Sequence, residues 1–184
     1  VCGDSDSTME EMVEAVRILR ERYGFRGYVH LKVLPGASYS MVREAAKLAD
    51  RISVNLEAPS KARLQELSST KDFGVDLVRR MRWISWLKRR GFLPSGHTTQ
   101  FVIGGGGESD LEVLRRVCWL YDKMDLNRVY YSAFTPIRGT PFEEKPKAPK
   151  VREHRLFQAD WLVRVYRFKL EELVFDEEGN LPLR

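Results

Sequence analysis

Apolar and polar positions alternate along the chain with two different periods. Four short segments, near 28–34, 51–57, 98–104 and 128–135, are rich in β-branched or aromatic residues and stop at proline or glycine, which is typical of strands. Around them, apolar residues recur every three or four positions, as in amphipathic helices. Because the helix and strand patterns alternate four times, the sequence predicts an α/β fold with parallel strands and right-handed crossover helices.

The predicted units divide the chain into three parts. Residues 1–140 contain the four strands and their helices, and the Pro/Lys-rich stretch 141–150 is too polar and broken to form an element. Residues 151–184 are predicted to form a long amphipathic helix, at about 151–173, followed by a tail. The pattern does not distinguish an open, doubly wound sheet from part of a (β/α) barrel.

The start of the first helix carries two signals. Thr8 and Glu11 have the spacing of a capping box, in which the side chain of each residue accepts a hydrogen bond from the backbone N–H of the other. Asp4 and Asp6 stand just before them, in the run "DSDS". A cluster of this kind can hold a metal ion, but immediately before a helix it is more typical of caps and turns.

Composition and charge narrow the class of protein. Of the 184 residues 43% are apolar and 31% charged, which suits a globular domain with a core. No apolar run approaches the roughly 18 residues of a membrane span, and no signal-peptide pattern is present. Two cysteines, Cys2 and Cys118, form neither a disulfide framework nor a metal knuckle, so we expect a reducing, cytoplasmic setting and no membrane.

Polar side chains gather where the predicted strands end. Lys32 closes the first strand, Ser53, Asn55 and Glu57 alternate along the second, and Gln100 lies within the third. Three polar groups on one face of an apolar strand are costly unless they meet a ligand, water or each other. Because parallel α/β folds bind ligands at the carboxyl ends of their strands, we expect the functional face here.

The glycine run "VIGGGGESD", at 102–110, follows the third strand directly. It lacks the Lys-Ser/Thr pair of a phosphate loop and the spacing of a dinucleotide loop, and Glu108 and Asp110 would repel a phosphate. A carboxylate at this point suits an amine or ammonium group, with the glycines allowing close approach of a ligand. The alternative is a structural turn in which Glu108 favours the helix dipole.

The net charge of +5 comes largely from arginine-rich helices. The last helix interleaves aromatic residues with arginines, a combination that binds single-stranded nucleic acid by stacking and charge. It equally allows the aromatic rings to pack on a sheet while the arginines reach solvent. The residues concerned are Phe157, Trp161, Tyr166 and Phe168, with Arg152, Arg155, Arg164 and Arg167.

Several segments resemble, in order, parts of the radical S-adenosylmethionine enzymes. Ile103, Gly105 and Glu108 match the last three elements of the G-x-I-x-G-x-x-E pattern at the fifth barrel strand of that superfamily, although Phe101 stands at the leading glycine. "DRISVNLEAP" resembles the fourth-strand segment, and "VYYSAFTPIRGTPFEEKP" the sixth strand and its exit loop. Within the superfamily, the chain is most similar to DNA modification or repair enzymes that carry a helix-hairpin-helix tail and are encoded beside uracil-DNA glycosylases.

The resemblance implies about four βα units of a partial (β/α) barrel with S-adenosylmethionine as cofactor. Ser53, Asn55 and Glu57 would contact its ribose and methionine ends, and Lys32 its carboxylate or a substrate phosphate. The complete set of implied cofactor-binding residues is Lys32, Ser53, Asn55, Glu57, Gln100, Ile103, Gly105 and Glu108. DNA is the implied partner, modified through a 5′-deoxyadenosyl radical.

The family holds a [4Fe–4S] cluster through three cysteines spaced C-x-x-x-C-x-x-C, and this chain has no such triplet. We therefore expect the cluster ligands upstream of Val1, and we expect the chain by itself to be inactive, with no catalytic or metal-binding residue of its own. The 28–34 strand would leave an open sheet edge, which predicts self-association. Two alternatives remain: a cluster-free (β/α) barrel enzyme acting on a sugar or phosphorylated metabolite, and a non-catalytic nucleic-acid-binding module.

Overall fold

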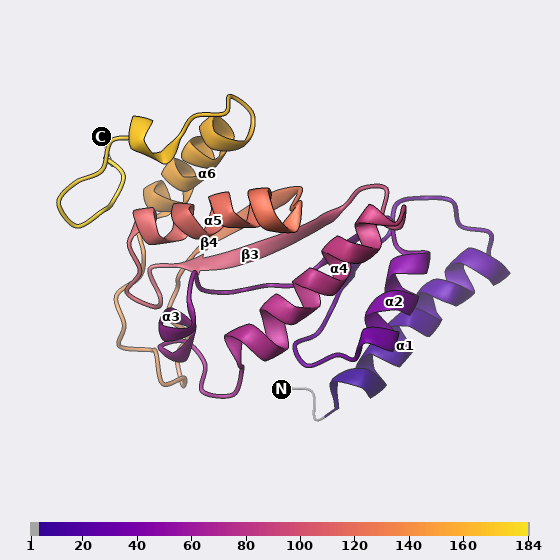
Figure 1. Ribbon diagram of the computed structural model, residues 1–184. Coiled ribbons are helices and arrows are strands. Elements are labelled where there is room, and N and C mark those ends of the chain that lie inside the picture. The colour runs from indigo at the N-terminus through magenta and orange to yellow at the C-terminus, as the bar shows by residue number, and fades with distance from the viewer. Residues whose placement is uncertain (1–3, 184) are drawn as a thin grey trace. The chain divides into compact units, whose positions relative to one another are not determined.

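A computed structural model describes residues 4–183 and has the predicted fold class (Figure 1). Four parallel strands form one sheet in the order β1-β2-β3-β4, and helices join them, as in part of a (β/α) barrel. The strands are β1 (His30–Lys32), β2 (Arg51–Ser53), β3 (His97–Ile103) and β4 (Arg128–Ala133). No helix within the described residues is long and apolar enough to cross a membrane.

The first two strands are shorter than their apolar patterns predict. β1 and β2 have three residues each and pair in register, with Lys32 opposite Ser53. Beyond β2 the ladder is interrupted until an isolated bridge joins Glu57 to Phe101. Because β1 ends the strand order, pairing of its outer edge with a second chain stays a prediction.

The chain divides into two compact units built from interleaved segments. The first unit comprises 1–55, 71–99 and 124–128. Its helices α1 (Ser5–Arg17), α2 (Tyr39–Leu48) and α4 (Arg79–Arg89) pack side by side (Figure 1). A π-helical segment, Ile18–Arg22, extends the end of α1, and a second one, Phe73–Val78, precedes α4. The largest fully buried side chains of this unit are Met9, Ile52, Leu77, Met81, Ile84 and Leu87.

The predicted capping box of the first helix is wrong. α1 begins at Ser5, and the side chain of Asp4 accepts the N–H of Asp6 at 3.0 Å, so Asp4 is the cap. Asp6 reaches farther and accepts the N–H of Ser38 at 2.7 Å, which ties α1 to the start of α2. Thr8 lies inside the helix and donates to the Asp4 carbonyl. The "DSDS" run therefore caps a helix, as one of its two interpretations predicted.

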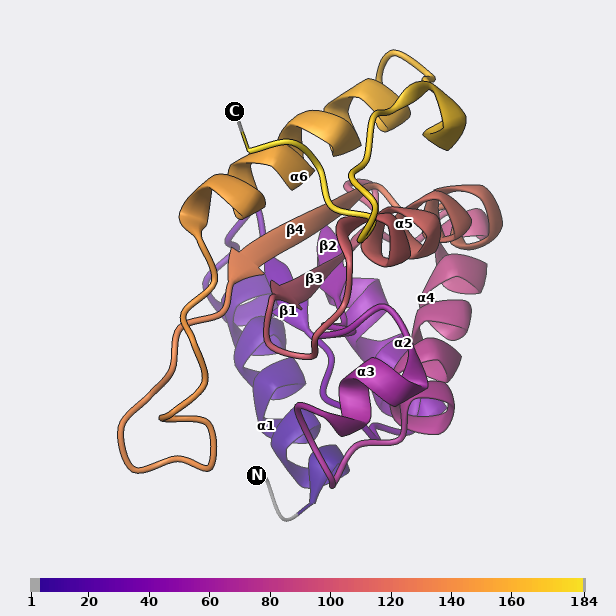
Figure 2. The same ribbon diagram turned by 90° about the vertical axis from the view of Figure 1, so that its left-hand side faces the viewer.

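The second unit comprises 56–70, 100–123 and 129–184. It contains the short α3 (Lys61–Gln65), α5 (Asp110–Met124), most of β4, and α6 (Lys150–Arg164), which runs along β4 (Figure 2). The C-terminal tail returns to α5, where Leu111 donates its N–H to the Gly179 carbonyl at 2.9 Å.

The last helix is shorter than predicted. α6 ends at Arg164, and a single 3₁₀ turn, Leu170–Glu172, follows it. Arg167 has a left-handed backbone with φ of 64°, which turns the chain away from the helix axis. The amphipathic pattern to 173 continues through this turn, so periodicity by itself did not mark the end.

A buried histidine lies in the first unit at the start of β3. His97 is 1% exposed, and its Nε2 donates to the Met124 carbonyl at 2.9 Å, because a carbonyl can only accept. Burial, which disfavours the charged ring, lowers the pKa of His97 from 6.5 to about 4. The ring is therefore neutral in the folded protein at neutral pH.

We expect the free energy of unfolding to fall as the pH drops through the interval from about 6.5 to about 4. Here the unfolded chain binds a proton at residue 97 and the folded chain does not, so acid favours unfolding, by up to about 3 kcal/mol from His97. Urea denaturation at pH 7, 5.5 and 4.5 measures this slope. His97→Gln keeps a donor for Met124 and should reduce it, while His154→Gln, at an exposed position, should leave it as it is. An equal slope in wild type and His97→Gln would contradict the assignment.

Candidate functional site

In the first unit, two of the predicted residues lie next to each other. Lys32 and Ser53 are register partners at the ends of β1 and β2. Lys32 and His30 are exposed on the face of β1 opposite to the buried Leu31. Ser53 is 8% exposed and Asn55 is half-buried. Lys32 and Ser53 therefore occupy neighbouring positions at the carboxyl ends of two strands, and their contact with a ligand stays a prediction.

In the second unit, Glu57 has an unusual backbone. Its φ is 62°, in the left-handed region that non-glycine residues rarely adopt. Two hydrogen bonds to β3 hold it there: Glu57 donates its N–H to the Gln100 carbonyl at 3.0 Å, and its own carbonyl accepts the N–H of Val102 at 2.8 Å. This conformation costs roughly 1–2 kcal/mol for a residue with a side chain, and such strain clusters at functional sites.

Glu108 organises the glycine run. Its carboxylate accepts the N–H of Gly104 through Oε1 and that of Gly106 through Oε2, the latter at 3.0 Å. The Glu108 side chain is fully buried. Because these contacts occupy the carboxylate, Glu108 folds the glycine loop, and a ligand at this loop would meet its backbone groups first. Contact between Glu108 and an amine stays a prediction.

The glycines allow the chain to pack against itself. A Cβ on Gly105 would lie 2.8 Å from Leu67 and 3.0 Å from Phe134, and one on Gly106 would lie 2.8 Å from the Arg63 carbonyl. Any side chain at these two positions would force neighbouring groups apart. Within this unit the glycines therefore serve the close approach of other segments of the same chain.

Arg152 of α6 supports the same loop, and the sequence analysis missed it as a positioning residue. Its Nη2 donates to the Glu108 carbonyl at 2.6 Å, and its Nε donates to Asp110 Oδ1 at 2.7 Å. Asp110 is fully buried and accepts the N–H of Leu181 through Oδ2 at 2.9 Å. Lys145 adds a bond from its Nζ to the Gly105 carbonyl at 2.9 Å. Nothing in the sequence pattern pairs these residues, because 40 to 71 positions separate the partners.

The other predicted residues of β3 divide between its two faces. Ile103 and Phe101 are fully buried, so the side chain of Ile103 belongs to the core of the second unit. Gln100 lies on the alternate face and is half-buried. The expectation that Ile103 contacts a cofactor stays a prediction, and its burial means that such contact needs a cavity inside the core.

The aromatic residues of α6 divide between packing and exposure. Phe157 meets the ring of Tyr131 edge to face, with centroids 5.0 Å apart. Trp161, Tyr166 and Phe168 are exposed, by 50%, 64% and 40%. The Arg164 guanidinium lies 5.5 Å from the centre of the Trp161 ring. We call Trp161, Arg164, Tyr166 and Phe168 the α6 aromatic surface.

The described residues hold no group of three or more His, Cys, Asp or Glu side chains that could bind a metal ion. Cys118, on α5, is half-buried, and burial raises the pKa of its thiol. Cys2 lies outside the described residues.

Comparison with known proteins adds no relative: no family model, curated protein or solved structure matches the chain. The fold and the polar strand ends define the class, a parallel α/β protein whose candidate functional groups lie at the carboxyl ends of its strands.

Proposed function

We propose that this chain is the S-adenosylmethionine-binding part of a radical enzyme that modifies nucleic acid. The observation that carries the proposal is the left-handed backbone of Glu57, which lies beyond the end of β2 and is held by two hydrogen bonds to β3. Strain of this kind persists where the position of a side chain matters for function. A carboxylate suits the two hydroxyls of a ribose, because its oxygens can accept the hydrogen bonds that both hydroxyls donate.

The residue types suit the cofactor, whereas the cluster lacks ligands among the described residues. Within the first unit, Lys32 and Ser53 offer a cation and a hydroxyl for a carboxylate such as that of methionine. Within the second unit, Glu57 offers acceptors for hydroxyl groups such as those of ribose. The described residues offer no cysteine set for a [4Fe–4S] cluster, so we derive no reaction step through one. The part proposed for this chain is to bind and orient the cofactor.

Nucleic acid is the proposed partner because of the α6 aromatic surface. Its exposed rings can stack on bases and its arginine can pair with phosphate, as single-stranded nucleic acid requires. The same feature supports the rival proposal of a non-catalytic binding module. Oligonucleotide binding that is salt-dependent and lost in Trp161→Leu would support both, so the cofactor experiment decides between them.

We expect S-adenosylhomocysteine, a stable analogue of the cofactor, to bind the chain in isothermal titration calorimetry. Glu57→Gln should weaken binding at least about tenfold, because it removes a charged acceptor. Glu66→Gln, an exposed glutamate in the same unit, is the matched control and should bind like wild type. Glu57→Gly should lose binding while its melting temperature is unchanged or higher, because glycine adopts the left-handed backbone without strain.

Two results would contradict the proposal. Equal affinity of wild type and Glu57→Gln, in folded protein, would remove Glu57 from the site. Coding DNA upstream of Val1 without a C-x-x-x-C-x-x-C triplet would exclude the radical mechanism and favour a cluster-free barrel enzyme.

A further inference from the structure

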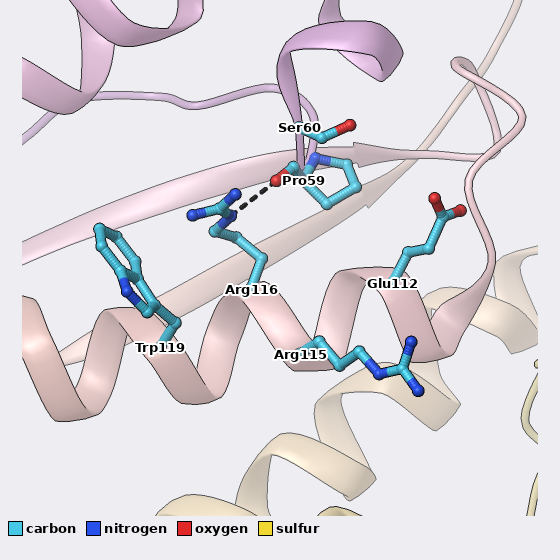
Figure 3. Close-up of a pocket in the computed structure, with 6 residues that line it drawn as sticks. All are labelled: Pro59, Ser60, Glu112, Arg115, Arg116 and Trp119. Atoms are coloured by element: carbon cyan, nitrogen blue, oxygen red, sulfur yellow. Dashed lines mark hydrogen bonds between the residues drawn. The ribbon is translucent and has the colours of Figure 1, made fainter.

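A pocket of about 320 Å³ lies on the second unit (Figure 3). One wall is the segment Pro59–Ser60, before α3. The other wall is the exposed side of α5, with Glu112, Arg115, Arg116 and Trp119. The volume is at the lower end of the range for small-ligand sites, which is roughly 300–1,000 Å³.

The centre of the pocket is a fixed pair of an aromatic ring and a cation. Arg116 Nε donates to the Pro59 carbonyl at 2.7 Å, which holds the side chain across the pocket. The Arg116 guanidinium lies 5.0 Å from the centre of the Trp119 ring. Burial lowers the pKa of Arg116, so an anion beside it would recover part of the solvation that the guanidinium has lost.

The rim of the pocket carries a second cation, Arg115, and a carboxylate, Glu112, whose charge is already paired. Glu112 accepts two hydrogen bonds from Arg63, at 3.3 and 3.0 Å, so the carboxylate does not repel an anion as a lone charge would. Arg115 is exposed and has no hydrogen bond or ion pair within residues 4–183. Its guanidinium is directed away from Pro59 in Figure 3, and an exposed arginine can change rotamer to meet a ligand.

We propose that this pocket binds a nucleotide, with the base stacked on Trp119 and the phosphate held by Arg115 and Arg116. An indole ring offers a flat surface to any base, and the guanidinium groups of two neighbouring helix positions can both reach a phosphate once Arg115 changes rotamer. Such a phosphate could belong to a free mononucleotide or to one unit of a single strand. The site does not depend on the cofactor proposal, because it shares no residue with it.

The experiment measures quenching of tryptophan fluorescence and affinity by calorimetry, with adenosine 5′-monophosphate, adenosine, inorganic phosphate and a 5′-phosphorylated octanucleotide. We expect the monophosphate to bind more tightly than adenosine or phosphate. Trp119→Leu should weaken this binding about five- to hundredfold through lost stacking. Arg115→Ala, at an exposed position that cannot disturb the core, should weaken it about fivefold and reduce its salt dependence.

Trp86→Leu is the matched control, because it removes an exposed tryptophan that also carries a stacked arginine, Arg90, and belongs to neither proposed binding surface. It should leave the binding of both the mononucleotide and the octanucleotide unchanged. Octanucleotide binding that falls with Trp119→Leu, without monophosphate binding, would identify a nucleotide within a strand. If wild type, Trp119→Leu and Arg115→Ala bound each of the four ligands with the same affinity, the proposal would be overturned. This holds whether or not S-adenosylhomocysteine binds.

Discussion

Replacing Arg152 with methionine is expected to lower the free energy of unfolding by about 3–5 kcal/mol, because it leaves buried acids without their cation. The Arg152 side chain is 15% exposed, while those of Asp110 and Glu108 are fully buried. A methionine fills much of the same volume, so the loss reports mainly on charge and hydrogen bonds. Urea denaturation followed by circular dichroism measures the effect.

Two further variants separate the buried pair from other effects of the change. Lys150→Met removes an exposed cation from the same helix and should change stability by less than about 0.5 kcal/mol. Adding Asp110→Asn to Arg152→Met should recover part of the loss, because the remaining amide needs no counter-charge. Hydrogen exchange at Leu181, whose N–H bonds to Asp110, should become faster in the single variant. If Arg152→Met lost no more stability than Lys150→Met, the ion pair of Arg152 with Asp110 would not stabilise the glycine loop.

Replacing Asp160 with alanine is expected to cost roughly 4 kcal/mol, because each of two stranded phenol hydroxyls costs about 1–3 kcal/mol. Asp160 is 2% exposed and accepts hydrogen bonds from Tyr121 and from Tyr131, the latter at 3.2 Å. Arg164 Nε adds a contact at 3.2 Å. Burial and then the charge of Asp160 raise the pKa of both phenols, so both tyrosines remain donors.

Chemical denaturation of a small variant series tests this cluster of α5, β4 and α6. Tyr131→Phe and Tyr121→Phe should each cost less than Asp160→Ala, because removing a donor leaves a carboxylate that keeps its other partners. Asp122→Ala, at an exposed position on α5, should be nearly neutral. If Asp160→Ala were as stable as Asp122→Ala, the buried carboxylate would not be a stabilising centre of the second unit.

Local patterns were enough to predict the elements. Period-two and period-3.6 apolar patterns, with the prolines and glycines between them, placed four strands and the main helices near their observed positions. These patterns predicted the ends of the helices and strands less accurately. Asp4 caps the first helix in place of Thr8, and α6 ends at Arg164, because caps and left-handed turns depend on one or two backbone conformations that periodicity does not encode.

The candidate site was predictable in part for the same reason. The apolar patterns placed Lys32 and Ser53 in strands, and the structure makes these two residues register partners. The predicted alternation through Asn55 and Glu57 lies beyond β2, which ends at Ser53. It did not reveal that Glu57 has a left-handed backbone, nor that Glu108 is occupied by Gly104 and Gly106. A carboxylate in the sequence has the same appearance whether it faces a ligand or a backbone amide.

The pattern of amino acids was sufficient to predict the order of strands and helices along the chain, the parallel α/β class and the end of the strands where polar groups gather. These follow from interactions between residues within a few positions of each other, which every helix or strand must satisfy locally. The tertiary structure decided the pairing of Arg152 with Asp110, the sharing of Asp160 by two tyrosines, and the pocket beside Trp119. Each of these joins positions from about 30 to 60 residues apart, and such contacts form only when burial makes an unpaired charge or hydroxyl costly.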